Sequence, residues 1–105
     1  MYWASVMQSL SYSIRAKVWL YPGKAGWHFI TIPKSDADEI KKEYIWPRRG
    51  FNSIPVNVTI SKTTWKTSIF PDKGSTYLLP LKKDVRIKED IKTGDTITIS
   101  LEVIT

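Results

Sequence analysis

Residues 65–86, with the sequence WKTSIFPDKGSTYLLPLKKDVR, decide the fold of this chain. Residues 65–70 have the composition of a β-strand, and the following Pro-Asp-Lys-Gly at 71–74 predicts a tight turn. Residues 76–79 predict the returning strand, and Pro80 breaks that strand and redirects the chain into a basic segment. The stretch therefore predicts a hairpin that gathers hydroxyls, cations and large aromatic side chains.

Four further strands are predicted at residues 12–20, 27–33, 54–60 and 96–103. Apolar and polar residues alternate in all of them except 27–33, which is apolar on both faces apart from His28 and Thr31. In the first of these strands Leu20 is expected on the inward face with Ile14 and Val18. Pro55 indicates an edge or a bulge in the third strand.

One helix and one short helical turn are predicted between the strands. The helix is expected to begin after Ser35, a good N-cap, and to end before Pro47, with Ala37 and Ile40 at helical spacing. Residues 82–90 can form the short helical turn. Closing a sheet of short strands removes its exposed edges, so we expect a mostly β fold, a small closed β-barrel of six or seven strands.

The length and composition limit the organisation and the chemistry of the protein. A chain of 105 residues can build one hydrophobic core but not two, so we expect an N-terminal extension at 1–11 and one domain at 12–105. Cysteine is absent and His28 is the sole histidine, which excludes disulfides, a Cys nucleophile and Cys- or His-based zinc sites. The sequence therefore predicts no metal and no cofactor.

The apolar residues at 1–10 prompt the question of a signal peptide. They follow no basic region and are interrupted by polar residues, and no stretch reaches the roughly 18 apolar residues of a membrane span. We predict a cytoplasmic protein with no membrane partner, as a monomer or a homodimer. The net charge of +6 is spread along the chain, so nucleic acid is admitted as a partner but not favoured.

Several spaced motifs point to a known family. The segments 65–71, 77–86 and 91–97, together with Trp27-x-Phe29 and Pro33, resemble the bacterial family called domain of unknown function 1905, over roughly residues 12–104. This resemblance implies a small closed β-barrel and no established activity. The 91–97 segment is also similar to the glycine-aspartate turn of cradle-loop barrels, a group that contains DNA-binding regulators.

Polar residues of the hairpin and of the basic segment after it are the main candidates for a ligand-binding site. They are Lys66, Thr67, Ser68, Lys82, Lys83 and Arg86. The spacing brings Lys82, Lys83 and Arg86 onto one helical face, which serves either as an anion site or as an ordinary solvated surface. Thr67 and Ser68 could add hydroxyl donors if the hairpin folds over that face.

The aromatic residues give a secondary candidate. An exposed Trp46 beside Arg48 and Arg49 would stack on a base while the arginines neutralise phosphates. The simpler interpretation of the aromatic content is packing, and Trp27 and Trp65 are predicted to be core residues.

No catalytic residue is predicted. His28 is interpreted as a packing residue between two aromatic neighbours, and Ser68 has neither a nucleophile motif nor a base nearby in sequence. We therefore expect a non-enzymatic domain that binds a small anionic or polar ligand, or a protein partner. The alternative is a nucleic-acid-binding barrel related to cradle-loop regulators.

Overall fold

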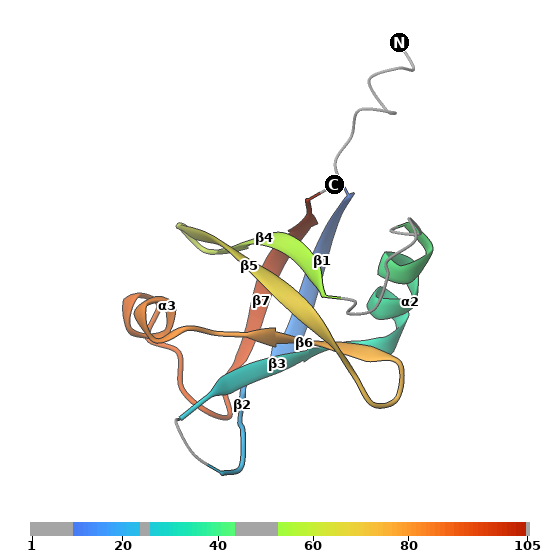
Figure 1. The fold of residues 1–105 in the computed structure, drawn as a ribbon. Helices are drawn as coiled ribbons and strands as arrows, with labels where there is room; N and C mark the ends of the chain where they lie inside the picture. The colour runs from blue at the N-terminus through green and yellow to red at the C-terminus, as the bar shows by residue number, and fades with distance from the viewer. Residues whose placement is uncertain (1–9, 24–25, 44–52, 105) are drawn as a thin grey trace.

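A computed structural model describes residues 10–23, 26–43 and 53–104 (Figure 1). Seven strands and two short helices lie within these residues. They are β1 (Leu10–Lys17), β2 (Trp19–Leu20), β3 (His28–Ile32), α2 (Lys34–Glu43), β4 (Ile54–Ile60), β5 (Thr63–Asp72), β6 (Thr76–Pro80), α3 (Lys83–Lys88) and β7 (Thr96–Val103). Neither of these helices is long and apolar enough to cross a membrane.

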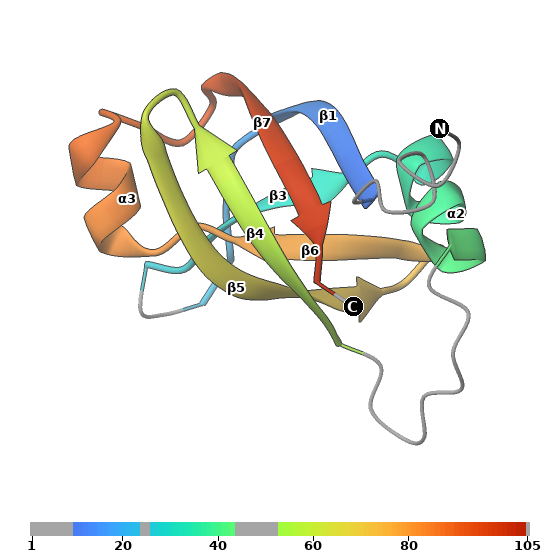
Figure 2. The same ribbon diagram turned by 90° about the horizontal axis from the view of Figure 1, so that it is seen from above.

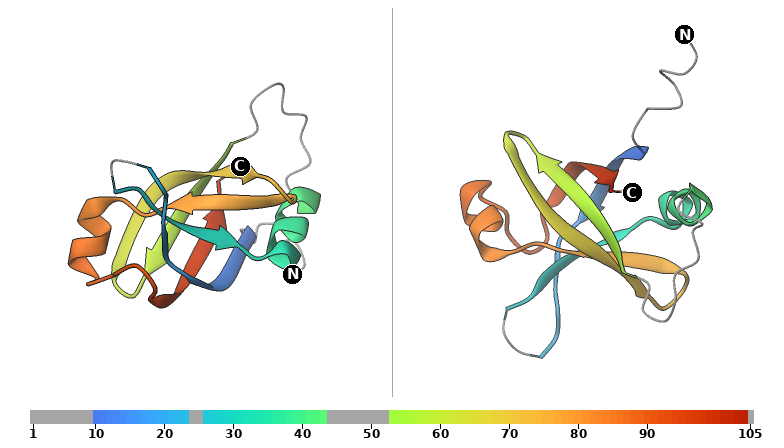
Figure 3. Two further views of the ribbon diagram at one scale, coloured as in Figure 1. Left: turned by 90° about the horizontal axis from the view of Figure 1, so that it is seen from below. Right: turned by 45° about the horizontal axis from the view of Figure 1, so that its top comes forward.

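The strands form one antiparallel sheet in the order β1-β7-β4-β5-β6-β3-β2. The sheet is strongly curled, so that β4 and β7 cross over β3 and β6 when the molecule is seen from above (Figure 2). The two helices lie at opposite ends of the curled sheet (Figure 3). The mostly β fold predicted from the sequence is thus confirmed as a half-barrel with two helices.

The half-barrel is open, unlike the closed barrel expected from the sequence. One continuous segment supplies both edges of the sheet, because β1 pairs with β7 while β2 pairs with β3. The two strands separate at Val18, whose N–H donates to Asp95 O (2.8 Å) and whose C=O accepts from the Gly94 N–H (2.8 Å). Only the two residues of β2 pair with β3, and the described part of β1 forms no ladder with it. The sheet therefore does not close.

The inner surface of the curl carries the hydrophobic core. The predicted alternation is confirmed in β4 and β7, whose inward residues Ile54, Val58 and Leu101 are fully or almost fully buried. Two expectations were wrong. Leu20 was expected to point inward but is 47% exposed, because the strand is interrupted at Val18. Pro55 indicated an edge or a bulge, whereas β4 lies inside the sheet.

The position of Pro55 in an interior strand has a simple explanation. The ladder between β4 and β7 begins at Val56, so the missing N–H of Pro55 interrupts no pairing there, while its C=O accepts from the Ile104 N–H (3.0 Å). Proline is tolerated in a sheet where no ladder hydrogen bond needs its N–H.

Helix α2 begins two residues earlier than expected. Lys34 is already helical, and the Ala37 N–H donates to Pro33 O at 2.8 Å, so Ser35 lies inside the first turn and is not the N-cap. Lys34 also pairs with Asp38 at 3.2 Å on the exposed face. The predicted inner residues Ala37 and Ile40 are fully buried, whereas Pro47, the expected limit of the helix, lies outside the described residues.

Strand β5 is longer than the sequence predicted. It begins directly after the two-residue turn Ser61–Lys62 and continues through Pro71 and Asp72, which were expected in the next turn. Its inward residues Trp65 and Ile69 are buried, as predicted. The extra length allows β5 to pair with two different strands, β4 over its first seven residues and β6 over its last three.

The turn between β4 and β5 provides a test of this register. Ser61 has φ = 54°, a left-handed conformation that costs a non-glycine residue about 1 kcal/mol. We expect Ser61→Gly to raise the free energy of unfolding by about 0.5 kcal/mol in urea denaturation, since the gain exceeds the extra entropy of glycine in the unfolded chain. The matched control Ser100→Gly, at an exposed site within β7, should lower it by about 0.5–1 kcal/mol. Destabilisation by both changes would contradict the turn geometry.

Candidate functional site

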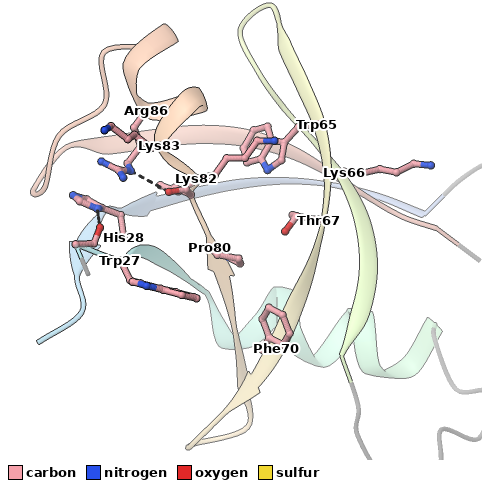
Figure 4. Close-up of a pocket in the computed structure, with 12 residues that line it drawn as sticks. Trp27, His28, Trp65, Lys66, Thr67, Phe70, Pro80, Lys82, Lys83 and Arg86 are labelled. Carbon is pink, nitrogen blue, oxygen red and sulfur yellow. Dashed lines mark hydrogen bonds between the residues drawn. The ribbon is translucent and has the colours of Figure 1, made fainter. Parts of the chain in front are cut away.

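The candidate site lies where β5 and β6 stop pairing. Their ladder joins Phe70 to Leu78 and Asp72 to Thr76 and extends no further. On the N-terminal side of Phe70, β5 pairs only with β4 in the described part of the chain, while β6 continues along β3 as far as Pro80. The two strands therefore diverge and leave a wedge between them (Figure 4).

Pro80 explains why the pairing stops. The Leu81 N–H donates to His28 O (2.9 Å), so the backbone groups of Leu81 point toward β3. Because these groups alternate in direction along a strand, those of Pro80 point toward β5. Continuing the register from Phe70 and Leu78 would place Pro80 opposite Ser68. Since proline has no N–H, this pair would lack the hydrogen bond from position 80 to Ser68 O, one of its two.

A pocket of about 500 Å³ occupies the wedge. Its walls come from the turn before β3, from β5, from the end of β6 and from the start of α3. The lining residues are Gly26, Trp27, His28, Trp65, Lys66, Thr67, Phe70, Pro80, Leu81, Lys82, Lys83 and Arg86. The pocket volume lies within the range of typical small-molecule sites.

Helix α3 forms one wall and is held in place at both ends. Just before the helix, Leu81 O accepts a hydrogen bond from Arg86 Nε (3.0 Å), and Val85 within the helix is buried in the core. At its end the Thr63 hydroxyl of β5 donates to the Glu89 carboxylate. The wall is therefore attached to the same strand that forms the opposite side of the pocket.

The turn after α3 adds a local ion pair. Asp90, at φ = 54°, accepts a hydrogen bond from Lys92 Nζ at 2.7 Å. This contact lowers the pKa of Asp90 and raises the pKa of Lys92. Lys92 also donates its backbone N–H to the Asp95 carboxylate (2.8 Å), so the Asp95 side chain caps this turn.

The charges around the pocket are of one sign. Lys82 and Lys83 lie at the start of α3 and Arg86 lies in its last turn, and no acidic residue lines the pocket. The ion pairs within the described residues, Lys34 with Asp38 and Lys92 with Asp90, involve none of these cations. The predicted cationic cluster therefore faces a concave site without a carboxylate neutralising it in the described part of the chain.

The structure brings five of the six main candidate residues to this pocket. Lys66 lines it, but its amine points away from the α3 cations, and Thr67 is half-buried on the opposite face of β5 (Figure 4). Ser68 does not line the pocket and lies on the Lys66 face of the strand. The secondary candidates Trp46, Arg48 and Arg49 lie outside the described residues.

Several pocket residues were not identified from the sequence. Trp27 was expected in the core but is 56% exposed, because it precedes β3 in the turn, where its C=O accepts from the Tyr21 N–H at 2.8 Å. Pro80 was predicted only to break the strand, and no role was predicted for Phe70. His28 lines the pocket with its Nδ1 2.6 Å from Gly26 O. The sequence did carry one signal for an exposed tryptophan, because it contains more tryptophans than a small core usually holds.

Trp27, which lines the pocket, contacts another aromatic ring. The rings of Trp27 and Trp19 lie 6.0 and 5.3 Å from the ring of Phe29, and Trp19 Nε1 donates to Thr31 Oγ1 (3.0 Å). Such tilted ring pairs are stabilising beyond their buried area. Trp27 thus presents one ring face from a packed aromatic cluster.

The pocket offers several kinds of chemical group. Its lining supplies cations, a hydroxyl, an imidazole and aromatic faces, but no carboxylate and no thiol. Within the described ranges no group of three or more His, Asp or Glu residues is placed to hold a metal ion. The arrangement can bind an anion whose remaining part is apolar.

Comparisons with known proteins identify the family and leave the activity open. No curated protein matches the chain. The family model described as "Domain of unknown function (DUF1905)" matches residues 15–101, which confirms the resemblance seen in the sequence. Because this match covers most of the 105 residues, the chain belongs to the DUF1905 family.

Proposed function

We propose that this domain is a non-catalytic binding module whose pocket takes an anionic ligand with an apolar part. One observation carries the proposal. Three cations, Lys82, Lys83 and Arg86, line the same pocket as the apolar residues Trp27, Phe70 and Pro80, and the lining contains no carboxylate. Ligand pockets of this size combine such apolar walls with a few charged groups that fix the orientation of the ligand.

The cations and the apolar residues of the pocket have separate roles in this proposal. Arg86 uses Nε to hold the backbone of Leu81, which leaves the outer N–H groups of the guanidinium for a carboxylate or a phosphate. Trp27, Phe70 and Pro80 offer apolar contact area to the rest of the ligand. A purely inorganic anion would use only the first part of the site, and a neutral apolar molecule only the second.

The lining favours binding over catalysis. A hydrolase needs a nucleophile and a base within hydrogen-bond reach of each other. The hydroxyl that lines the pocket belongs to Thr67, and the imidazole of His28 holds its Nδ1 at Gly26 O. This arrangement supports a non-enzymatic role. The cytoplasmic location stays a prediction from the sequence.

A minimal ligand with both parts is N-acetyl-L-phenylalanine. We expect it to bind with a dissociation constant in the millimolar range, about 4–5 kcal/mol, when titrated into the protein and followed by amide NMR shifts. The neutral N-acetyl-L-phenylalaninamide and acetate should each bind about tenfold more weakly or not at all, because each lacks one of the two parts.

The double variant Lys82→Ala/Lys83→Ala should weaken N-acetyl-L-phenylalanine binding by about tenfold. The control Lys62→Ala/Lys73→Ala removes the same charge from two exposed turn residues outside the pocket and should leave the affinity unchanged. Equal weakening in both variants would show that net charge, and not the pocket, attracts the anion. Absence of binding by all three probes would refute the proposal.

A nucleic-acid-binding module is the second candidate. It is favoured by the exposed Trp27 ring, which lines the same pocket as Lys82 and Lys83 and offers a stacking face beside cations. Its distinguishing property is the loss of affinity with salt. We expect mixed single-stranded DNA and RNA to bind no better than millimolar at low salt; tighter binding with a steep salt dependence would support this candidate instead.

A further inference from the structure

Part of the β5 edge that faces the pocket pairs with no strand of the described residues. β4 covers the other edge from Thr63 to Ile69, whereas β6 reaches only from Phe70 to Asp72. The pocket lies along the uncovered part, where Trp65, Lys66 and Thr67 line it. The site is thus a groove beside an open strand edge as well as a cluster of cations.

The register indicates which backbone groups point into this groove. A two-residue loop joins Ile60 to Thr63, and the residues flanking such a loop form a hydrogen-bonded pair. Backbone groups alternate along a strand, so Trp65 and Thr67 direct theirs toward β4. Lys66 and Ser68 then direct their N–H and C=O groups toward the groove. Ser68, which does not line the pocket with its side chain, is the residue whose C=O would need the N–H that Pro80 lacks.

We propose that the ligand is an extended acidic segment of a partner protein, which adds to β5 as an antiparallel strand at Lys66 and Ser68. This inference rests on the proposed function and identifies the partner of the same pocket. The free edge from Thr64 to Ser68 spans about 13 Å, enough to pair with about five residues. Strand addition of this kind uses main-chain hydrogen bonds for affinity and side-chain pockets for specificity.

Side-chain alternation sets the pattern of the added strand. Directly opposed residues in an antiparallel pair share one face of the sheet. A residue opposite Lys66 therefore meets its ammonium group and is expected to be acidic, whereas the neighbouring residues face the side of Trp65 and Thr67 and are expected to be apolar. Arg86 and its neighbours at the start of α3 add to the attraction for an acidic segment.

Charge complementarity selects an acidic partner over a second copy of this chain. The protein carries a net charge of +6, and Lys66 lies on the open edge itself. A charged lysine on an edge strand opposes pairing with the same edge of another copy. A compact anion would use the side-chain cations and leave the backbone groups of Lys66 and Ser68 to water, so the open edge favours a peptide.

Backbone methylation provides a sharp test. The probe is a mixture of acetylated and amidated hexapeptides with Glu at alternate positions and Val, Leu, Ile or Phe at the others. Because the Glu residues oppose Lys66 and Ser68, their N–H groups face β5, and those of the apolar residues face away. We expect N-methylation of the Glu residues to weaken binding in calorimetry by about tenfold or more, and N-methylation of the apolar residues to leave it nearly unchanged.

Each result of this experiment separates the inference from the proposed function. If both methylated mixtures bind like the unmodified one, or both are weakened equally, strand addition is wrong. If the peptides do not bind while N-acetyl-L-phenylalanine does, strand addition is wrong and the anion pocket stands. If neither binds, both proposals fail. The selective loss with methylated Glu supports strand addition, provided that Lys82→Ala/Lys83→Ala also weakens the unmodified mixture.

Discussion

The missing N–H of Pro80 is the constraint on which the candidate site depends. In a continuous hairpin β6 would follow β5 along its whole length, and Ser68 would pair with the residue at position 80. Proline cannot complete that pair, whereas it can still occupy the end of the ladder with β3, where its N–H is not needed. One residue therefore ends a strand pairing and opens a pocket.

The other features of the site follow from where the chain goes after Pro80. Leu81 is bound to His28 and buried, which holds the chain against β3, and α3 then begins within two residues. This short connection brings the cations of α3 to the wedge between the strands. The bonds from Arg86 to Leu81 and from Thr63 to Glu89 keep a helix of only six residues in a fixed position.

The sequence was a good guide where one residue pattern determines one structure. Strands buried on one side produce a period of two, so β4 and β7 and their inward residues were predicted correctly. Lys83 and Arg86 were placed correctly on a short helix because Leu81 and Val85 anchor it by local spacing. These features need only neighbours along the chain.

Features that depend on distant strands were not predictable in the same way. The exposure of Trp27 results from the turn that precedes β3, although its aromatic neighbours suggested a core residue. The open half-barrel results from the two-residue pairing of β2, whose length no local pattern sets. The pocket itself requires knowing that β6 pairs with β3 at the point where it leaves β5, which is a relation between three strands.

The most direct test of this account is amide hydrogen exchange in the free protein, residue by residue along β5. If Pro80 leaves the edge open, the amides of Lys66 and Ser68 exchange rapidly with water, while those of Trp65 and Thr67, which face β4, exchange slowly. This alternation between neighbouring residues is the predicted result. Slow exchange at Lys66 and Ser68, equal to that of Trp65 and Thr67, would show that the edge is already paired and would contradict the account.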